Sequence, residues 1–277
     1  MAQQTTTTDL KTAATEPADD SARTPPPRAA TFLNYVHTSV AWPLVALYTV
    51  VMATLSLACS PFDRRGRLQH WCASTWSRMI ARTALLDVRV HGAEHLRAGE
   101  SYVFLSTHQS WMDIPVMLGY LPAQLRIAAK REVFLIPFLG WHLRRAGHIP
   151  INRGSTAESI ASLQRAARLL GGGVSAFLFP EGTRTRDGSL QPLKKGGFRL
   201  ALESGLPLVP VTIVGTRSAM PRGSMALRAG PVELHIDPPV PTAGLDDADL
   251  PALMQQVRAA MLRHFGRESG VRSQKSE

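Results

Sequence analysis

The sequence predicts an α/β domain, with a mixed or parallel sheet flanked by helices, preceded by an N-terminal membrane-anchoring helical hairpin. From residue 87 onwards, apolar runs of strand length alternate with helical patterns, and polar motifs follow several of the runs. An uncharged apolar stretch of helix length precedes them. With 277 residues, 44% of them hydrophobic, the chain can bury one sizeable core.

The net charge of +10 favours a polyanionic partner, such as nucleic acid, an anionic membrane surface or a phosphorylated substrate. Nucleic acid is not expected, because the basic residues show no aromatic interleaving and no nucleic-acid-binding motif. The two cysteines, Cys59 and Cys72, fit no metal-ligand spacing and no disulfide framework. We therefore expect no metal site and a reducing, cytoplasmic setting for the domain.

Residues 1–30 read as a disordered tail, with little to bury and no secretory signal pattern. Val40–Cys59 then contains no charged residue and is long enough to enter a bilayer. Arg64, Arg65 and Arg67 follow at once, which favours a cytoplasmic location for the C-terminal end of this helix. Its moderate hydrophobicity leaves open whether it spans the membrane or inserts into one leaflet.

Residues 67–86 have apolar positions at helical spacing with arginines on other faces, which predicts an amphipathic helix. Trp71 and Trp76 suit the headgroup boundary of a membrane, although a plain core helix would show the same pattern. Residues 31–86 are thus interpreted as the anchoring hairpin.

Residues 87–265 form the predicted α/β domain, and residues 266–277 a polar tail. The strands are expected at 88–91, 102–105, 125–129, 148–151, 175–179, 208–214 and 232–236. The helices are expected at 114–119, 137–145, 156–170, 197–203 and 249–265.

The stretch STHQSWMD (106–113) directly follows an apolar strand. Ser110 and Asp113 have capping-box spacing, so a helix that begins between His108 and Asp113 allows the loop to bring imidazole and carboxylate together. Asp113 would then hold one ring nitrogen and leave the other to accept a proton, as a general base on a substrate hydroxyl. Ser106 and Ser110 are possible nucleophiles but lie in no Gly-x-Ser-x-Gly elbow. A loop histidine beside a helix cap would show the same spacing.

A second motif, FPEGTRTR (179–186), also follows an apolar strand, and ligands bind at such strand ends in open α/β sheets. Arg184 offers a planar guanidinium that matches phosphate oxygens. Glu181 can accept from substrate hydroxyls or orient the arginine. An ordinary surface turn with an ion pair is the alternative.

Two further basic residues, Lys130 and Arg153, follow other strands, and the pair Lys194-Lys195 precedes a helix, where it could also bind the phosphates of an acyl carrier. They form either a solvated basic face or an electropositive mouth that gathers an anionic headgroup at a membrane.

Together these motifs resemble the glycerolipid acyltransferase family, most closely the bacterial 1-acylglycerol-3-phosphate acyltransferases. The resemblance covers roughly residues 85–240, in the family's order: THQSWMD (107–113), AKREVFLIPFLGW (129–141), GHIPINR (147–153), FPEGTRT (179–185) and VPVTIVG (209–215).

The resemblance implies a glycerolphosphate-acyltransferase-like fold and transfer of a fatty acyl group to the 2-hydroxyl of a lysophospholipid. The thioester of acyl-CoA or acyl-carrier protein is the implied co-substrate, and no cofactor is expected. A lyso-ornithine lipid is the alternative acceptor. With membrane lipids as partners, we expect the chain at the inner (cytoplasmic) membrane, with its active domain facing the cytoplasm. The implied roles are catalysis for His108 and Asp113, and substrate binding for Glu181, Gly182, Thr183, Arg184, Arg153 and Lys130.

Overall fold

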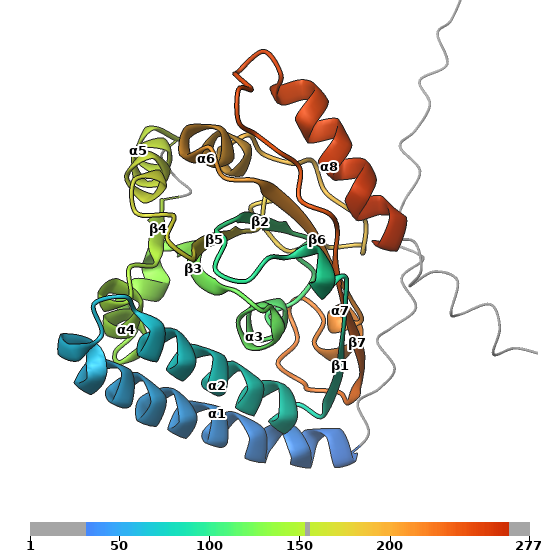
Figure 1. Cartoon of the computed structure of the whole chain (residues 1–277). Helices are drawn as coiled ribbons and strands as arrows, with labels where there is room; N and C mark the ends of the chain where they lie inside the picture. The colour runs from blue at the N-terminus through green and yellow to red at the C-terminus, as the bar shows by residue number, and fades with distance from the viewer. Residues whose placement is uncertain (1–31, 153–155, 266–277) are drawn as a thin grey trace, which may run out of the picture.

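The computed structural model describes residues 32–152 and 156–265. The predicted tails of residues 1–30 and 266–277, and Arg153, lie outside these described residues. Within them, seven strands form one mixed sheet with helices on both faces (Figure 1), which confirms the predicted fold class.

The strands lie in the order β1-β7-β6-β2-β5-β3-β4. Neighbouring strands are parallel except for the antiparallel pair β6 and β7. The carboxyl ends of β6, β2, β5, β3 and β4 therefore share one edge of the sheet, where ligands bind in open α/β sheets. The bounds are β1 (Leu86–His91), β2 (Val103–Ser106), β3 (Gln124–Lys130), β4 (Ile149–Ile151), β5 (Val174–Leu178), β6 (Leu208–Val214) and β7 (Gly230–Ile236).

The central strand β2 is buried on both faces, which is why its sequence is a continuous apolar run. All four of its residues are buried, because helices cover both faces. Phe104 belongs to the core cluster that includes side chains of α2 and α3, whereas Val103 and Leu105 belong to the cluster with α5, α6 and α8. Because successive side chains of β2 point to opposite faces of the sheet, this one strand contributes to the hydrophobic core on each face.

The helices largely follow the expected segments, but the helix expected at 137–145 begins two residues later, because Phe138 at its cap position has φ +62°, outside the helical region. One short helix, α7, was not expected. The bounds are α1 (Phe32–Cys59), α2 (Arg67–Thr83), α3 (Asp113–Tyr120), α4 (Leu139–Arg145), α5 (Thr156–Ala167), α6 (Gly196–Ser204), α7 (Thr216–Ala219) and α8 (Leu250–Phe265).

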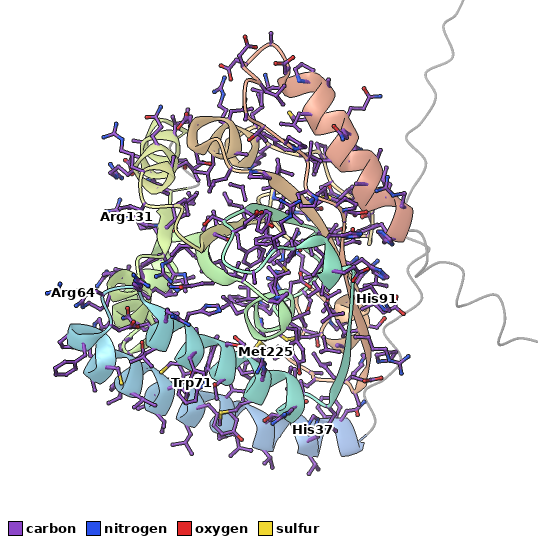
Figure 2. All side chains as sticks on the ribbon, viewed as in Figure 1. His37, Arg64, Trp71, His91, Arg131 and Met225 are labelled. Atoms are coloured by element: carbon purple, nitrogen blue, oxygen red, sulfur yellow. The ribbon has the colours of Figure 1, made fainter. Side chains whose placement is uncertain are left out.

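Helices α1 and α2 run antiparallel as one layer, with α3 between them and the sheet (Figure 1). Trp76 Nε1 donates a hydrogen bond to Thr49 Oγ1 of α1 (3.0 Å), so Trp76 faces the partner helix instead of the expected headgroup boundary. Trp71, in contrast, is 56% exposed. Arg64 marks the turn between the two helices (Figure 2).

Among the described residues, α1 lies in the one segment long and apolar enough to cross a membrane. Residues 34–62 have a mean hydropathy of 1.8, and only 22% of the most apolar window is buried inside the protein. A core helix of a soluble domain would be mostly buried. The exposed apolar side chains of α1 therefore favour a lipid-facing helix.

Candidate active site

The structure brings His108 and Asp113 together at the carboxyl edge of the sheet. His108 lies on the loop that leaves β2, and Asp113 is the first residue of α3. The loop folds back so that His108 Nδ1 lies 2.8 Å from Asp113 Oδ2. Asp113 is fully buried, and the His108 side chain retains 10% exposure.

The Asp113 carboxylate accepts four hydrogen bonds, and one of them, from His108, fixes the orientation of the imidazole. Its Oδ2 also accepts from the backbone N–H groups of Gln109 (2.7 Å) and Ser110 (2.8 Å), and its Oδ1 accepts from Thr216 Oγ1 (2.5 Å). A carboxylate that only accepts is ionised, and the N-terminus of α3 favours that charge. His108 Nδ1 therefore carries the proton, and the lone pair is on Nε2.

The two serines of this loop have structural roles. Ser110 is not the helix cap that its spacing predicts, because the cap position is Met112. The Ser110 hydroxyl accepts from the Met112 N–H (3.2 Å) and donates to the Met220 carbonyl (2.7 Å). The Ser106 hydroxyl donates to a neighbouring carbonyl (3.1 Å). Among the described residues, neither hydroxyl is hydrogen-bonded to His108, so the geometry favours a base over a serine nucleophile.

The loop after β5 holds the other side of His108. Phe179 stacks on the imidazole with ring centroids 3.7 Å apart. Glu181 Oε1 accepts from the His108 backbone N–H (2.7 Å), and the Thr185 N–H donates to the His108 carbonyl (2.9 Å). Glu181 Oε2 accepts from the Gln191 N–H (2.9 Å). The backbone of His108 is thus as tightly held as its ring.

Glu181 is only 3% exposed, and burial raises the pKa of its carboxyl to about 7, while the two backbone N–H donors act in the opposite direction. The resemblance implies that Glu181 contacts the glycerol phosphate. Both of its oxygens already accept from the backbone, which favours a positioning role, and the substrate contact stays a prediction.

The turn at Gly182 brings a lysine beside the same loop. Gly182 has φ +72°, a left-handed conformation that glycine adopts at low cost, and its N–H donates to the Phe179 carbonyl (3.0 Å). A Cβ at this position would lie 2.9 Å from Lys194 Nζ. Lys194 therefore lies against the turn that carries the predicted phosphate ligands.

The remaining predicted substrate ligands differ in their placement. The Arg184 guanidinium carbon lies 5.1 Å from the ring centroid of Trp111, so Arg184 lies beside the loop that carries His108. Thr183 is exposed on the same turn. Lys130 ends β3, which β5 separates from β2, and its Nζ lies 3.0 Å from Glu132 Oε1.

No described group of three histidine, cysteine or acidic side chains surrounds His108. Within residues 32–152 and 156–265, such a grouping occurs at His91, Glu233 and His235 on β1 and β7. Whether catalysis proceeds without a metal or cofactor, as the sequence predicts, stays a prediction.

Comparison with known proteins places this geometry in a family. The family described as Acyltransferase matches residues 87–214. The chain is 35% identical over 198 residues to a chloroplastic 1-acyl-sn-glycerol-3-phosphate acyltransferase of Brassica napus, which covers 69% of this chain and 57% of that protein. It is 36% identical over 181 residues to the human 1-acyl-sn-glycerol-3-phosphate acyltransferase alpha, which covers 65% of this chain and 64% of that protein. The chain thus spans about three fifths of the length of these relatives.

A solved structure extends the likeness to nearly all of the fold. The crystal structure of PlsC, the 1-acyl-sn-glycerophosphate acyltransferase of Thermotoga maritima, superposes with a TM-score of 0.73 at 25% identity. The match covers 88% of this chain and 98% of that one. Residues 87–214 therefore form a domain of the family described as Acyltransferase, and the fold of the chain matches that of PlsC.

Proposed function

We propose that this protein transfers a fatty acyl group from acyl-CoA or acyl-carrier protein to the 2-hydroxyl of 1-acyl-glycerol-3-phosphate, giving phosphatidic acid for phospholipid synthesis. The observation that carries the proposal is the His108–Asp113 pair, whose 2.8 Å contact leaves Nε2 as the proton acceptor. The named relatives, which are 1-acyl-sn-glycerol-3-phosphate acyltransferases, support the choice of acceptor.

In the proposed reaction, His108 Nε2 takes the proton of the 2-hydroxyl as its oxygen attacks the thioester carbonyl. Asp113 stabilises the imidazolium that forms. The tetrahedral intermediate then collapses, the carbon–sulfur bond breaks, and the thiolate leaves with the proton returned by His108. The acyl group passes directly to the acceptor, in accord with the structural roles of both loop serines.

The acceptor phosphate is proposed to bind at the turn after β5. Arg184, held over Trp111, supplies a planar guanidinium for phosphate oxygens, and Lys194 beside Gly182 adds a second positive charge. Lys130, at the end of β3, is proposed to extend this positive region along the sheet edge, where it would attract the anionic headgroup. Arg153 lies outside the described residues, and its assistance to the phosphate rests on the family resemblance alone.

The active domain is proposed to face the cytoplasm from the inner (cytoplasmic) membrane. The exposed apolar side chains of α1 would lie in lipid, and the exposed ring of Trp71 at its boundary. Arg64, Arg65 and Arg67 at the turn between α1 and α2 would lie against anionic headgroups on the cytoplasmic side. Both substrates would then reach the site from the leaflet or the cytosol.

The deciding experiment is acyl transfer by detergent-solubilised protein from labelled acyl-CoA or acyl-carrier protein, with lysophosphatidate and lyso-ornithine lipid offered in parallel. We expect product from lysophosphatidate and its loss in His108→Ala, with circular dichroism unchanged. Product only from lyso-ornithine lipid would retain the base and overturn the phosphate site. Near-normal activity of His108→Ala would falsify the proposed mechanism.

The phosphate site has its own matched pair of variants. Arg184→Ala should raise the KM for lysophosphatidate, because it removes a charged bidentate donor, whereas Arg186→Ala removes an exposed arginine two residues away and should leave this KM unchanged. A KM defect confined to the acyl donor would contradict the assignment of Arg184.

A further inference from the structure

A second cluster of titratable side chains lies on β1 and β7, away from the catalytic loop. These strands pair in parallel, with His91 opposite His235. Register partners in a sheet share a face, and Glu233 shares the face of His235 because it lies two residues earlier. Figure 2 places His91 on the side of the molecule opposite Arg64 and Arg131. β6 lies between β7 and β2, so this cluster is separate from the His108 site.

The three side chains present the ligand chemistry of a transition-metal site. One donor atom from each of His91, Glu233 and His235 lies within 4.8 Å of the others. His235 Nε2 already lies 2.8 Å from Glu233 Oε2, so these two donors are close to the separation of about 3.4 Å expected around a tetrahedral zinc ion. His91 is exposed, so its ring can rotate the remaining distance. The His235 and His91 rings stack with centroids 4.8 Å apart.

The surroundings supply a second, independent observation. Asp237 directly follows β7 and its Oδ1 accepts from Arg263 Nη2 (2.8 Å), while His264 of α8 stacks on His235 with ring centroids 4.3 Å apart. Asp237 Oδ2 and His264 Nδ1 are both buried, and neither has a hydrogen-bond partner among the described residues. Buried polar atoms without partners are rare and mark a place where water or an ion belongs. The water ligands of a metal held at His235 would offer partners to these atoms.

We propose that His91, Glu233 and His235 bind a divalent transition metal of the zinc type. Two imidazoles and one carboxylate select such a metal over magnesium or calcium, which prefer oxygen ligands. The bound ion would connect the edge strand β1 to β7 and stabilise the folded chain, because the site forms only when the two strands pair. The proposal does not depend on the acyl transfer reaction.

The test is titration of the full, tag-free, detergent-solubilised chain with zinc chloride by calorimetry, after treatment with a chelator. We expect one zinc ion per chain and no heat from magnesium chloride. His91→Gln and Glu233→Gln should each weaken zinc binding at least about tenfold, the scale on which lost metal-site groups act. His91 is exposed, so its substitution does not threaten the fold.

The matched control is His95→Gln. His95 lies at the same corner and its Nδ1 contacts the Ile236 carbonyl (2.9 Å), but it is not one of the three donors. Zinc binding should be unchanged in this variant, and zinc should raise the Tm of the wild type and of His95→Gln but not of His91→Gln. An absence of zinc binding, or equal weakening by His95→Gln, would overturn the proposal.

Discussion

Replacing Asp113 with asparagine separates the charge of this residue from its shape. The asparagine carbonyl oxygen can replace Oδ2 and keep the bonds from His108 Nδ1 and from the two backbone N–H groups. Its amide then faces Thr216, whose hydroxyl can turn to accept from it. The network therefore stays satisfied, and only the negative charge is removed. We expect the unfolding free energy to fall by less than about 2 kcal/mol.

In the proposed reaction, the catalytic loss follows from the imidazolium that forms when His108 takes the proton of the hydroxyl. Two unit charges about 4 Å apart interact by about 4 kcal/mol at an effective dielectric constant of about 20. The substituted enzyme loses this attraction in the transition state, which corresponds to a kcat lower by about a thousandfold. The KM for each proposed substrate should change little, because Asp113 is fully buried behind His108 and offers no exposed atom to a ligand.

The assay is the rate of labelled phosphatidate formation at saturating acyl-CoA and lysophosphatidate, with thermal unfolding followed in parallel. Thr216→Val is the matched control, since it removes one hydrogen bond that a neutral hydroxyl donates to Asp113 and keeps the negative charge. It should lose only a few-fold in kcat. An Asp113→Asn enzyme within tenfold of the wild type, or a Thr216→Val enzyme equally impaired, would refute the electrostatic argument.

Three further predictions concern the loop after β5 and the anchoring hairpin. The pKa of Glu181 is about 7 in the folded state and 4.5 ordinarily, so the folded chain binds the proton more strongly than the unfolded chain. The unfolding free energy should therefore fall by about 3 kcal/mol as the pH rises from the lower pKa to the higher. Urea unfolding at several pH values should show this pH dependence diminished in Glu181→Gln. Gly182→Ala forces an L residue to φ +72° and places a Cβ against Lys194, so thermal unfolding should show a loss of about 1–2 kcal/mol and kinetics a higher lysophosphatidate KM. Trp71→Ala should weaken flotation of the protein with anionic vesicles and leave its Tm unchanged, because the Trp71 ring is exposed. Trp76→Phe loses the hydrogen bond to Thr49, so it should lower the Tm and leave flotation intact. A loss of flotation in Trp76→Phe, or a lower Tm in Trp71→Ala, would contradict the geometry of the α1–α2 hairpin.

Local patterns in the sequence predict the strands and the two loops of the site because both depend on short-range features. Continuous apolar runs identify β2 and β5 as buried strands, and parallel strands end at one edge of a sheet. The motifs that follow the two runs are therefore expected side by side. The contact between His108 and Asp113 needs only a helix start between them, which the sequence also indicates.

The missing parts of the site depend on strand order, which no local pattern contains. Thr216 follows the apolar run VPVTIVG, but its bond to Asp113 exists because β6 pairs with β2. The sequence alone indicates no role for Trp111, whereas the structure places the Arg184 guanidinium over its ring. Trp76 turns inward because α1 and α2 pack against each other, a choice that helical periodicity alone leaves open.

The residues that hold the His108 imidazole follow three strands that are neighbours in the sheet, β6, β2 and β5. This arrangement explains why the two acidic residues Asp113 and Glu181 lie so close together. Asp113 fixes the His108 ring from the α3 side, while Glu181 fixes its backbone from the loop after β5. The charge of Asp113 contributes to the raised pKa of Glu181, after the larger effect of burial. A positive charge that appears on His108 during proton transfer relieves this repulsion as well as pairing with Asp113. The pair of carboxylates therefore favours the charged imidazole, which is the form that His108 takes in the transition state of the proposed acyl transfer.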